Sequence, residues 1–244
     1  MCADAVSAAP TGRVPIVTKA FIDLHCHTRY SFDSLAAPEA VLRAAAQRGL
    51  THLAITDHDR IDGALRARDA APAGLTVIVG EEIKTAAGDL IAVFLERPVE
   101  PGRSVAETVA AVREQGGLVG VPHPFDRFRN SMARTEELTA IVGLVDWIEG
   151  YNARILGSSG NEQAAAFGKE QGIPTVAVSD AHTTLEVGVA YIVTEGDPST
   201  QAGLLAALPT AEMIVGRASY AVRLVTPLAS AVQRLRGNRR VVSR

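Results

Sequence analysis

The sequence is short of cysteine, of long apolar runs and of net charge, and each shortage excludes a class of protein. Only two cysteines, Cys2 and Cys26, occur in 244 residues, so a disulfide framework is excluded and a reducing cytoplasm is expected. No run of about 18 apolar residues is present, so no transmembrane segment is indicated. The formal charge of −3 argues against stable binding of duplex nucleic acid.

The length and composition are those of one large α/β domain, or at most two small ones. Residues 1–19 are expected to form a loose extension, residues 20–218 a folded catalytic unit, and residues 219–244 a basic tail. The tail holds six arginines after Val222 and no acid, and its leucines recur at helical spacing. It is expected to be helical, and either contacts an anionic membrane or nucleic acid or docks as a terminal helix.

Short apolar runs alternate with helical segments along the chain. Strands are expected at Phe21–Leu24, His52–Ile55, Leu75–Val79, Leu90–Leu95, Leu118–Val121, Val145–Ile148 and Thr175–Val178. Helices are expected at Pro38–Arg48, Ala64–Ala71, Ser104–Gly116, Glu136–Val142 and Asn161–Gln171. This alternation predicts a parallel sheet, either closed into a barrel or open and doubly wound. The open nucleotide-binding form has no support, because neither glycine-rich phosphate motif is present.

Five of the six histidines lie at or just beyond the end of a predicted strand: His25, His27, His58, His123 and His182. The carboxyl ends of parallel strands are where α/β enzymes build their active sites. Residues i and i+2 of a strand share a face, so the two imidazoles of His25-Cys26-His27 can converge on one ion while Cys26 points away. Asp23 shares that face and could orient a ligand. Two ordinary polar residues at a strand end remain the alternative.

The other polar motifs each have a structural alternative. Asp57-His58-Asp59 could be a turn with a helix cap, and Pro122-His123-Pro124 a strand-ending turn. After the third strand, at least one of Glu81 and Glu82 must face solvent or a cation. Taken together, the imidazoles and carboxylates suit two to three divalent ions, Mn, Zn or Fe, and clustered divalent ions commonly serve to hydrolyse phosphate esters.

In order along the chain, these motifs resemble the PHP (polymerase and histidinol phosphatase) phosphoesterases over roughly residues 20–195. The motifs are Asp23-Leu24-His25-Cys26-His27, Thr56-Asp57-His58-Asp59, Gly80-Glu81-Glu82, Pro122-His123-Pro124 and Ser179-Asp180-Ala181-His182. The resemblance implies an α/β fold, a distorted (β/α)7 TIM-like barrel, with a trinuclear metal site at the C-terminal rim of the strands.

The resemblance also implies a role for each matched residue. His25, His27 and Asp180 would hold a first metal, Glu82 would bridge to a second on His123, and His58, His182 and Asp33 would hold a third. Glu82, Asp180 and His182 would be the catalytic residues. Asp89 stands where many relatives have a histidine ligand, and it is either a ligand or a hairpin-turn residue. Asp33 is likewise either a ligand or a loop residue.

The expected reaction is hydrolysis of a phosphate ester, in which a hydroxide bridging two metals attacks phosphorus. Arg127, Arg129, Asn152 and Arg154 would bind the substrate phosphate, unless the arginines are solvated loop charges. Glu149, at a strand end, could support a metal ligand from behind. The substrate would be a small phosphorylated molecule; a nucleotide or short oligonucleotide is the alternative, cleaved by a 3′,5′-bisphosphate phosphatase or exonuclease.

Two readings of other classes compete. An amidohydrolase-like barrel also opens with H-x-H, but none of the three lysines ends a middle strand and the Asp-His-Asp motif would be unexplained. A non-catalytic metal-binding module should have lost several ligands, whereas one histidine is replaced here. Nothing in the sequence specifies an oligomeric state.

Overall fold

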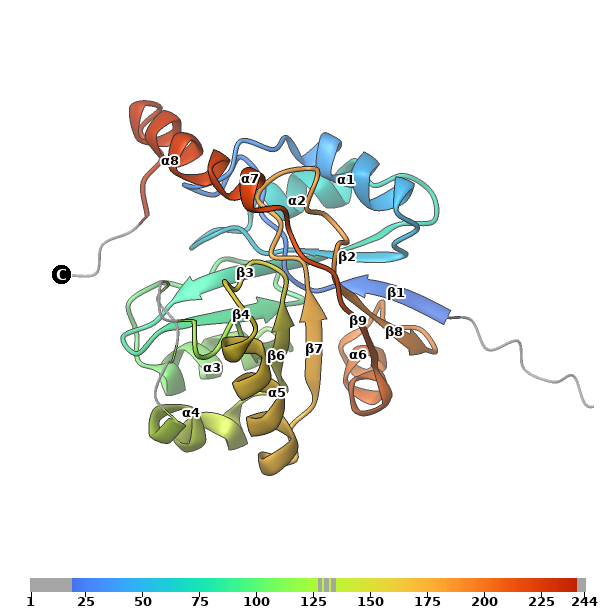
Figure 1. Ribbon diagram of the computed structural model, residues 1–244, viewed down its shortest axis with the longest axis vertical. Helices are drawn as coiled ribbons and strands as arrows, with labels where there is room; N and C mark the ends of the chain where they lie inside the picture. The colour runs from blue at the N-terminus through green and yellow to red at the C-terminus, as the bar shows by residue number, and fades with distance from the viewer. Residues whose placement is uncertain (1–18, 127–128, 130–131, 133–134, 241–244) are drawn as a thin grey trace, which may run out of the picture.

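The computed structural model describes residues 19–126, 129, 132 and 135–240. Figure 1 shows a curved sheet with helices packed around it. Its strands are β1 (Lys19–Asp23), β2 (His52–Ile55), β3 (Thr76–Lys84), β4 (Asp89–Val93), β5 (Leu118–Val121), β6 (Trp147–Asn152), β7 (Thr175–Val178), β8 (Tyr191–Glu195) and β9 (Glu212–Ile214). The helices are α1 (Pro38–Gln47), α2 (Asp62–Asp69), α3 (Val105–Arg113), α4 (Thr135–Ile141), α5 (Ser159–Gln171), α6 (Gln201–Ala207), α7 (Tyr220–Arg223) and α8 (Val225–Leu235), with 3-10 turns η1 (Val142–Leu144) and η2 (Leu208–Thr210).

The strands form one sheet that is nearly closed into a barrel, in the order β7-β6-β5-β4-β3-β2-β1-β8-β9. Beyond β1, Cys26 forms a parallel bridge with Ala181 beyond β7, and the amide of His27 donates to the Ala181 carbonyl at 2.8 Å. The ring from β1 to β7 therefore closes at the carboxyl ends of these two strands, while β8 pairs with β1 nearer its start. The expected distorted TIM-like barrel is confirmed.

The expectation of a parallel sheet is wrong for part of the ring. β4 runs antiparallel to both β3 and β5, and β8 runs antiparallel to β1 and β9. Only residues 85–88 connect β3 to β4, and such a short connection makes a hairpin rather than a parallel crossover. The hairpin also prolongs the third strand to Lys84, so Glu81 and Glu82 lie within β3 rather than after it.

Apolar side chains fill the barrel and cover its outer surface in two separate layers. The inner layer includes Ile22, Ile78, Ile91 and Trp147, all essentially inaccessible to solvent. The outer layer packs the sheet against the helices and is represented by Leu53. Because the interior is filled by side chains, as is usual in barrels of this size, functional groups must gather above it at the rim.

The two ends of the chain have different structures. Residues 1–18, most of the expected loose extension, lie outside the described residues. The expected basic tail contains α7 and α8, and α8 lies beside the loop that follows β1 (Figure 1). Among the described residues, no helix has the length and apolar character needed to span a membrane.

Candidate metal centre

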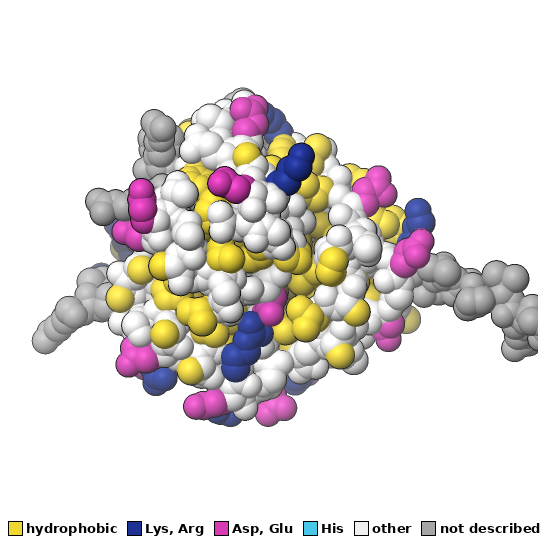
Figure 2. Space-filling model, turned by 90° about the horizontal axis from the view of Figure 1, so that it is seen from below, with side chains coloured by type: hydrophobic (Ala, Val, Ile, Leu, Met, Phe, Trp, Pro, Cys, Tyr) yellow, Lys and Arg dark blue, Asp and Glu magenta, His cyan; other side chains and the backbone are white. Residues whose placement is uncertain are grey.

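Five strand ends bring the polar motifs to one rim of the barrel. His25 and His27 follow β1, His58 follows β2, Glu82 lies in β3, His123 follows β5, and Asp180 and His182 follow β7. Figure 2 shows the molecule from below, where β6 and β7 begin; mixed hydrophobic and charged side chains cover that face, and no described histidine is visible on it. The strand ends therefore place these histidines at the opposite end of the strands from the face seen in Figure 2.

Four residues surround one point of this rim. The Nε2 atoms of His25 and His27 lie 2.9 Å apart, and Glu82 Oε2 lies 3.1 and 3.2 Å from them. Asp180 Oδ1 is 3.6 and 3.5 Å from the same two nitrogens. A tetrahedral ion with ligand bonds of about 2.05 Å would place its ligands about 3.3 Å apart. These separations match that value, so the group has the geometry of a metal site.

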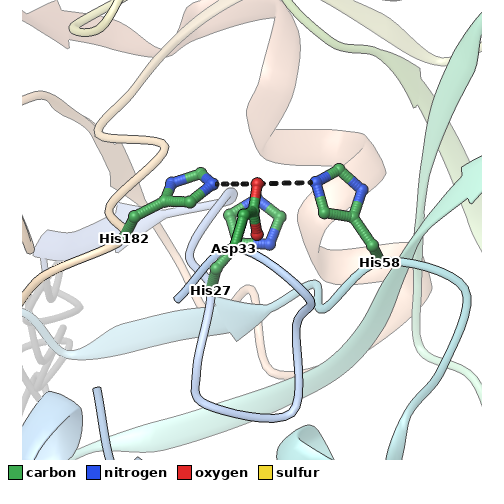
Figure 3. Close-up of side chains that lie close together, drawn as sticks. All are labelled: His27, Asp33, His58 and His182. Carbon is green, nitrogen blue, oxygen red and sulfur yellow. Dashed lines mark hydrogen bonds and ion pairs between the residues drawn. The ribbon is translucent and has the colours of Figure 1, made fainter. Parts of the chain in front are cut away.

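A second group lies beside the first and shares His27 with it. Asp33 stands between two histidine rings, with its Oδ2 3.0 Å from His182 Nε2 and 3.4 Å from His58 Nε2 (Figure 3). The His27 ring lies behind Asp33 in this view. The loop after β1 therefore carries Asp33 to the position expected of a ligand.

Glu82 lies between these groups and a further histidine. Its Oε2 is 3.3 Å from His58 Nδ1, and its Oε1 is 3.3 Å from His123 Nε2. Asp89 also lines the cavity at the rim, but neither ligand group includes it. Asp89 Oδ1 instead lies 2.5 Å from Nη2 of Arg240, beyond the end of α8. Glu82 thus lies between His123 and the histidines of both groups, whereas Asp89 pairs with a guanidinium.

A layer of polar contacts holds the ligands from behind. Glu149 Oε1 accepts from His25 Nδ1 at 2.6 Å, and its Oε2 accepts from the His123 amide, also at 2.6 Å. Asp23, expected to orient a ligand, contacts the backbone of His25 and not its ring: Asp23 Oδ1 accepts from the His25 amide at 3.4 Å. Its carboxylate accepts from the amides of Ser179 and Gly188, and so fixes the loop after β7. The reason is that β1 ends at Asp23, so the strict alternation assumed for 23, 25 and 27 does not hold.

The backbone itself is constrained at the rim. His123, Asp180 and Asp59 adopt positive φ angles of 30°, 52° and 55°. Such angles are uncommon for residues other than glycine, and they cluster at functional sites where the surroundings impose them. In the Pro-His-Pro and Ser-Asp-Ala-His motifs the surrounding structure therefore imposes the backbone conformation that orients His123 and Asp180.

The hydrogen bonds fix which ring nitrogen faces the centre. Nδ1 of His182 donates to the carbonyl of Asp180 at 2.9 Å, so in a neutral ring the lone pair of Nε2 faces Asp33 Oδ2. In His25 the bond to Glu149 has the same effect. Two lone-pair atoms at about 3 Å require a positive charge between them, either a second ring proton or a cation.

Unpaired buried atoms also fit a metal. Within the described part of the chain, Asp33 Oδ1 and Asp180 Oδ1 are buried and accept no hydrogen bond. Buried carboxylate oxygens are normally hydrogen-bonded or bound to a cation. Imidazole and carboxylate donors without thiolates suit Zn, Mn or Fe. The residues present therefore fit divalent metal ions, held by the two groups described.

Mutual attraction shifts the pKa values of these groups. Burial would raise the pKa of Asp180, but Arg129 and His25 hold it well below 3.8. Burial would lower the pKa of His27, but Asp180 and Glu82 raise it to about 9. Burial and the nearby Arg154 lower the pKa of His182. The Asp180 carboxylate is thus stabilised as an anion by the positive charge around it.

A cavity of about 440 Å³ opens above the ligands. Arg129 and Arg154 line it, as expected of substrate-binding residues, but both already have protein partners. Arg129 pairs with Asp180 and Asp126, and Arg154 Nη2 donates to Thr226 of α8 at 2.7 Å.

Asn152, another expected substrate residue, does not line this cavity. Asn152 is buried, and its amide donates to Glu149 and Asp180 at 2.8 and 3.0 Å. The side chain therefore supports the ligands rather than the cavity. Arg127 lies outside the described residues.

Some residues that hold the site carry no sequence signal. Ser31 Oγ lies 3.1 Å from His27 Nδ1 and accepts from the His58 amide. Glu186 Oε2 accepts from the amides of His182 and Thr183 at 3.1 and 2.9 Å, which fixes the turn after β7. Both lie in loops outside any motif, so only the folded chain identifies them.

Glu81 provides a pH-dependent prediction. Burial raises its pKa to about 8, whereas an unfolded chain has the ordinary value near 4.5. Between pH 4.5 and 8 the folded state keeps a proton on Glu81 that the unfolded state has lost. This contribution to the free energy of unfolding is therefore fully present below about pH 4.5. It falls as pH rises toward 8, by at most about 1.4 kcal/mol per pH unit. Glu81→Gln cannot titrate. We expect its melting temperature, measured with chelator present, to exceed that of wild type increasingly from pH 5 to 8; a constant difference would contradict this.

Comparison with known proteins places most of the chain in one family of sequences. A family model described as the PHP domain matches residues 23–155, and one described as PHP-associated matches residues 158–212. An uncharacterized protein of Methanocaldococcus jannaschii is 32% identical over 174 residues, which cover 70% of this chain and 69% of that protein. An error-prone DNA polymerase of Mycobacterium bovis is 34% identical over 134 residues, 48% of this chain but 12% of the polymerase.

A solved structure has the same fold. It is a two-domain protein of Bacteroides vulgatus described as containing a predicted PHP-like metal-dependent phosphoesterase. The TM-score is 0.69 at 19% sequence identity, with 88% of this chain and 70% of that chain covered. At this identity the likeness concerns the fold alone.

Proposed function

The chain belongs to the PHP family, and we propose that it is a metal-dependent phosphoesterase that hydrolyses a small phosphate ester. The observation that carries the proposal is the convergence of Glu82 with histidines from separate strand ends at the floor of one cavity.

The chain supplies two adjoining ligand groups. His25, His27, Glu82 and Asp180 would hold one ion, and Asp33, His58 and His182 would hold another, with His123 facing Glu82. Bound divalent ions would activate water and neutralise charge on the phosphoryl oxygens. We propose Mn, Zn or Fe in two to three equivalents. Glu82, Asp180 and His182 are the catalytic residues, since each would contact the ions at the reacting centre.

The chain's own residues would orient the ester within the cavity. Arg129 and Arg154 would present guanidinium groups to phosphate oxygens, a geometry that suits bidentate hydrogen bonds. For Arg129 this requires sharing its donors with Asp180, which it already contacts. Leu156 and Phe32 supply apolar walls for the remainder of the substrate.

The size of the cavity favours a small substrate. About 440 Å³ lies within the usual range of roughly 300–1,000 Å³ for small-molecule sites. Similarity to an error-prone DNA polymerase makes nucleotides and short oligonucleotides the second class to test. Stable duplex binding is not proposed, given the charge of −3, and two cysteines suit a reducing cytoplasm.

The proposal is tested by metal analysis of the purified chain together with hydrolysis of an aryl phosphate in added Mn²⁺ or Zn²⁺. We expect two to three equivalents of metal and measurable turnover. His25→Ala and His182→Ala should each remove at least one equivalent and lower turnover on the order of 10²-fold or more, because each removes a ligand of a different group. Little metal, with no turnover on mono- and diesters, would overturn the proposal and favour a binding module.

A further inference from the structure

The C-terminal segment Val225–Arg240, called the strap below, forms part of the cavity wall. Thr226 and Ser230 of α8 line the cavity, together with Arg240 beyond its end. The family matches end at residue 212, so the strap lies outside both matched regions. The contacts of the strap with the site therefore lie outside the regions that match the family models.

The strap is held by polar contacts and buries little apolar surface: Ala229 is the apolar residue of α8 that is buried. Leu224, just before α8, and Leu228 and Leu235 within it are 77%, 62% and 90% exposed. Thr226, Ser230 and Gln233 follow one another at helical spacing and turn toward the protein. A helix that docks only to bury surface would present its leucines instead. The polar face therefore indicates docking at a specific position.

Gln233 makes the central contact of the strap. Its side chain is 3% exposed, and its Nε2 lies 2.5, 2.9 and 2.8 Å from the carbonyl oxygens of Arg29, Ser31 and Ser34. An amide nitrogen has two hydrogens, so three carbonyls converge on two donors. All three carbonyls belong to the loop after β1 that carries Asp33.

Further contacts hold the same loop and both ends of the strap. Asn238 Nδ2 donates to the carbonyl of Tyr30 at 2.9 Å and lies 3.2 Å from that of Ser31. At the start of the strap Thr226 accepts from Arg154, and at its end Arg240 pairs with Asp89. The strap thus joins the Asp33 loop to Arg154 and Asp89, which also line the cavity.

We propose that Gln233 is a positioning residue that holds the Asp33 loop in the geometry required for metal binding by Asp33, His58 and His182. The inference rests on the metal centre of the proposed function. Asp33 reaches the histidines only from this loop, and its Oδ2 lies 3.0 Å from His182 Nε2. Gln233 holds the loop that carries Asp33, and its link to the His25, His27 and Asp180 group is indirect, through Ser31, whose Oγ lies 3.1 Å from His27 Nδ1. Its larger effect is therefore on the group that contains Asp33.

The test measures Mn²⁺ binding to the full chain, after chelation and reconstitution, by metal analysis and calorimetry without substrate. Gln233→Met keeps the length of the side chain but removes both donors. We expect it to weaken one class of sites by about 10- to 100-fold, as contacts behind metal ligands do, and to weaken the other class less, because the two groups share only His27. Asp33→Asn should weaken the same class, and Leu228→Ser, on the exposed face of α8, should bind as wild type.

Two outcomes would overturn the proposal: unchanged Mn²⁺ binding by Gln233→Met, or equal weakening of both classes. If Gln233→Met does not fold, Asn238→Ala provides the second variant, and it should weaken the same class as Asp33→Asn. Turnover is not read in this experiment. A chain that binds Mn²⁺ in a Gln233-dependent way but hydrolyses no phosphate ester would therefore overturn the proposed function and leave the role of Gln233 standing.

Discussion

Glu82→Gln is expected to abolish most activity while leaving the fold intact. Glu82 is the residue on which the histidines converge, within 3.1–3.3 Å of His25, His27, His58 and His123. Glutamine has nearly the same shape, but it removes the negative charge and replaces one carboxylate oxygen with an NH2 group, which cannot bind a cation. We expect loss of at least one metal equivalent and a fall in turnover on the order of 10³-fold.

Glu81→Gln is the matched control for this experiment. The two glutamates are adjacent in β3, and both are buried, but successive strand residues point to opposite faces. Glu81 Oε2 accepts from the Val99 amide at 2.9 Å, away from the histidines. Glu81→Gln should therefore keep wild-type metal content and turnover near neutral pH. If both variants lost activity equally, the assignment of Glu82 as the bridging carboxylate would be wrong.

The pairing of Glu81 with Glu82 also shows what the sequence could predict. The convergence of the histidines followed from strand-end positions, because the carboxyl ends of neighbouring strands meet at one edge of the sheet. The closed barrel, rather than an open sheet, followed from the family resemblance. That at least one of the two carboxylates should face solvent or a cation also followed from the sequence. The choice of Glu82 came from the family resemblance, whereas the burial of Glu81 depends on the β3–β4 hairpin. Alternation of strands and helices gave no sign of that hairpin.

Long-range contacts lay beyond sequence reasoning for a similar reason. Asp89 and Arg240 are 151 residues apart, and Gln233 contacts carbonyls about 200 residues earlier. Each side chain is ordinary in its own segment, since arginines and a glutamine in a basic tail suit a solvated helix. Their role arises only where α8 docks. The sequence therefore left Asp89 as either a metal ligand or a hairpin-turn residue. The structure shows a different contact, with the guanidinium of Arg240.

Gly120→Ala is expected to cause the largest loss of stability among the variants considered. Gly120 lies in β5 beside Trp147 of β6, inside the barrel. A Cβ at this position would come 2.1–2.6 Å from atoms of the Trp147 ring, far inside contact distance. Trp147 is buried on every side, so the ring has little room to move. Overpacking of this kind lowers the free energy of unfolding by about 1–3 kcal/mol, and a rigid indole places this variant at or above the upper end.

Chemical denaturation at a fixed pH would measure the effect of Gly120→Ala, with Gly143→Ala as control. A Cβ at Gly143 would meet nothing within 4 Å, so its free energy of unfolding should stay within about 0.5 kcal/mol of wild type. Trp147→Leu creates a cavity of its own, but it removes the ring that the new methyl group would strike. In the Trp147→Leu background, Gly120→Ala should therefore lower the free energy of unfolding less than it does in wild type. The difference, which is the interaction energy of the two positions, should be about 1–3 kcal/mol. If Gly120→Ala lowered the free energy of unfolding equally in both backgrounds, the indole would not pack over Gly120, and the described packing of the barrel interior would be wrong.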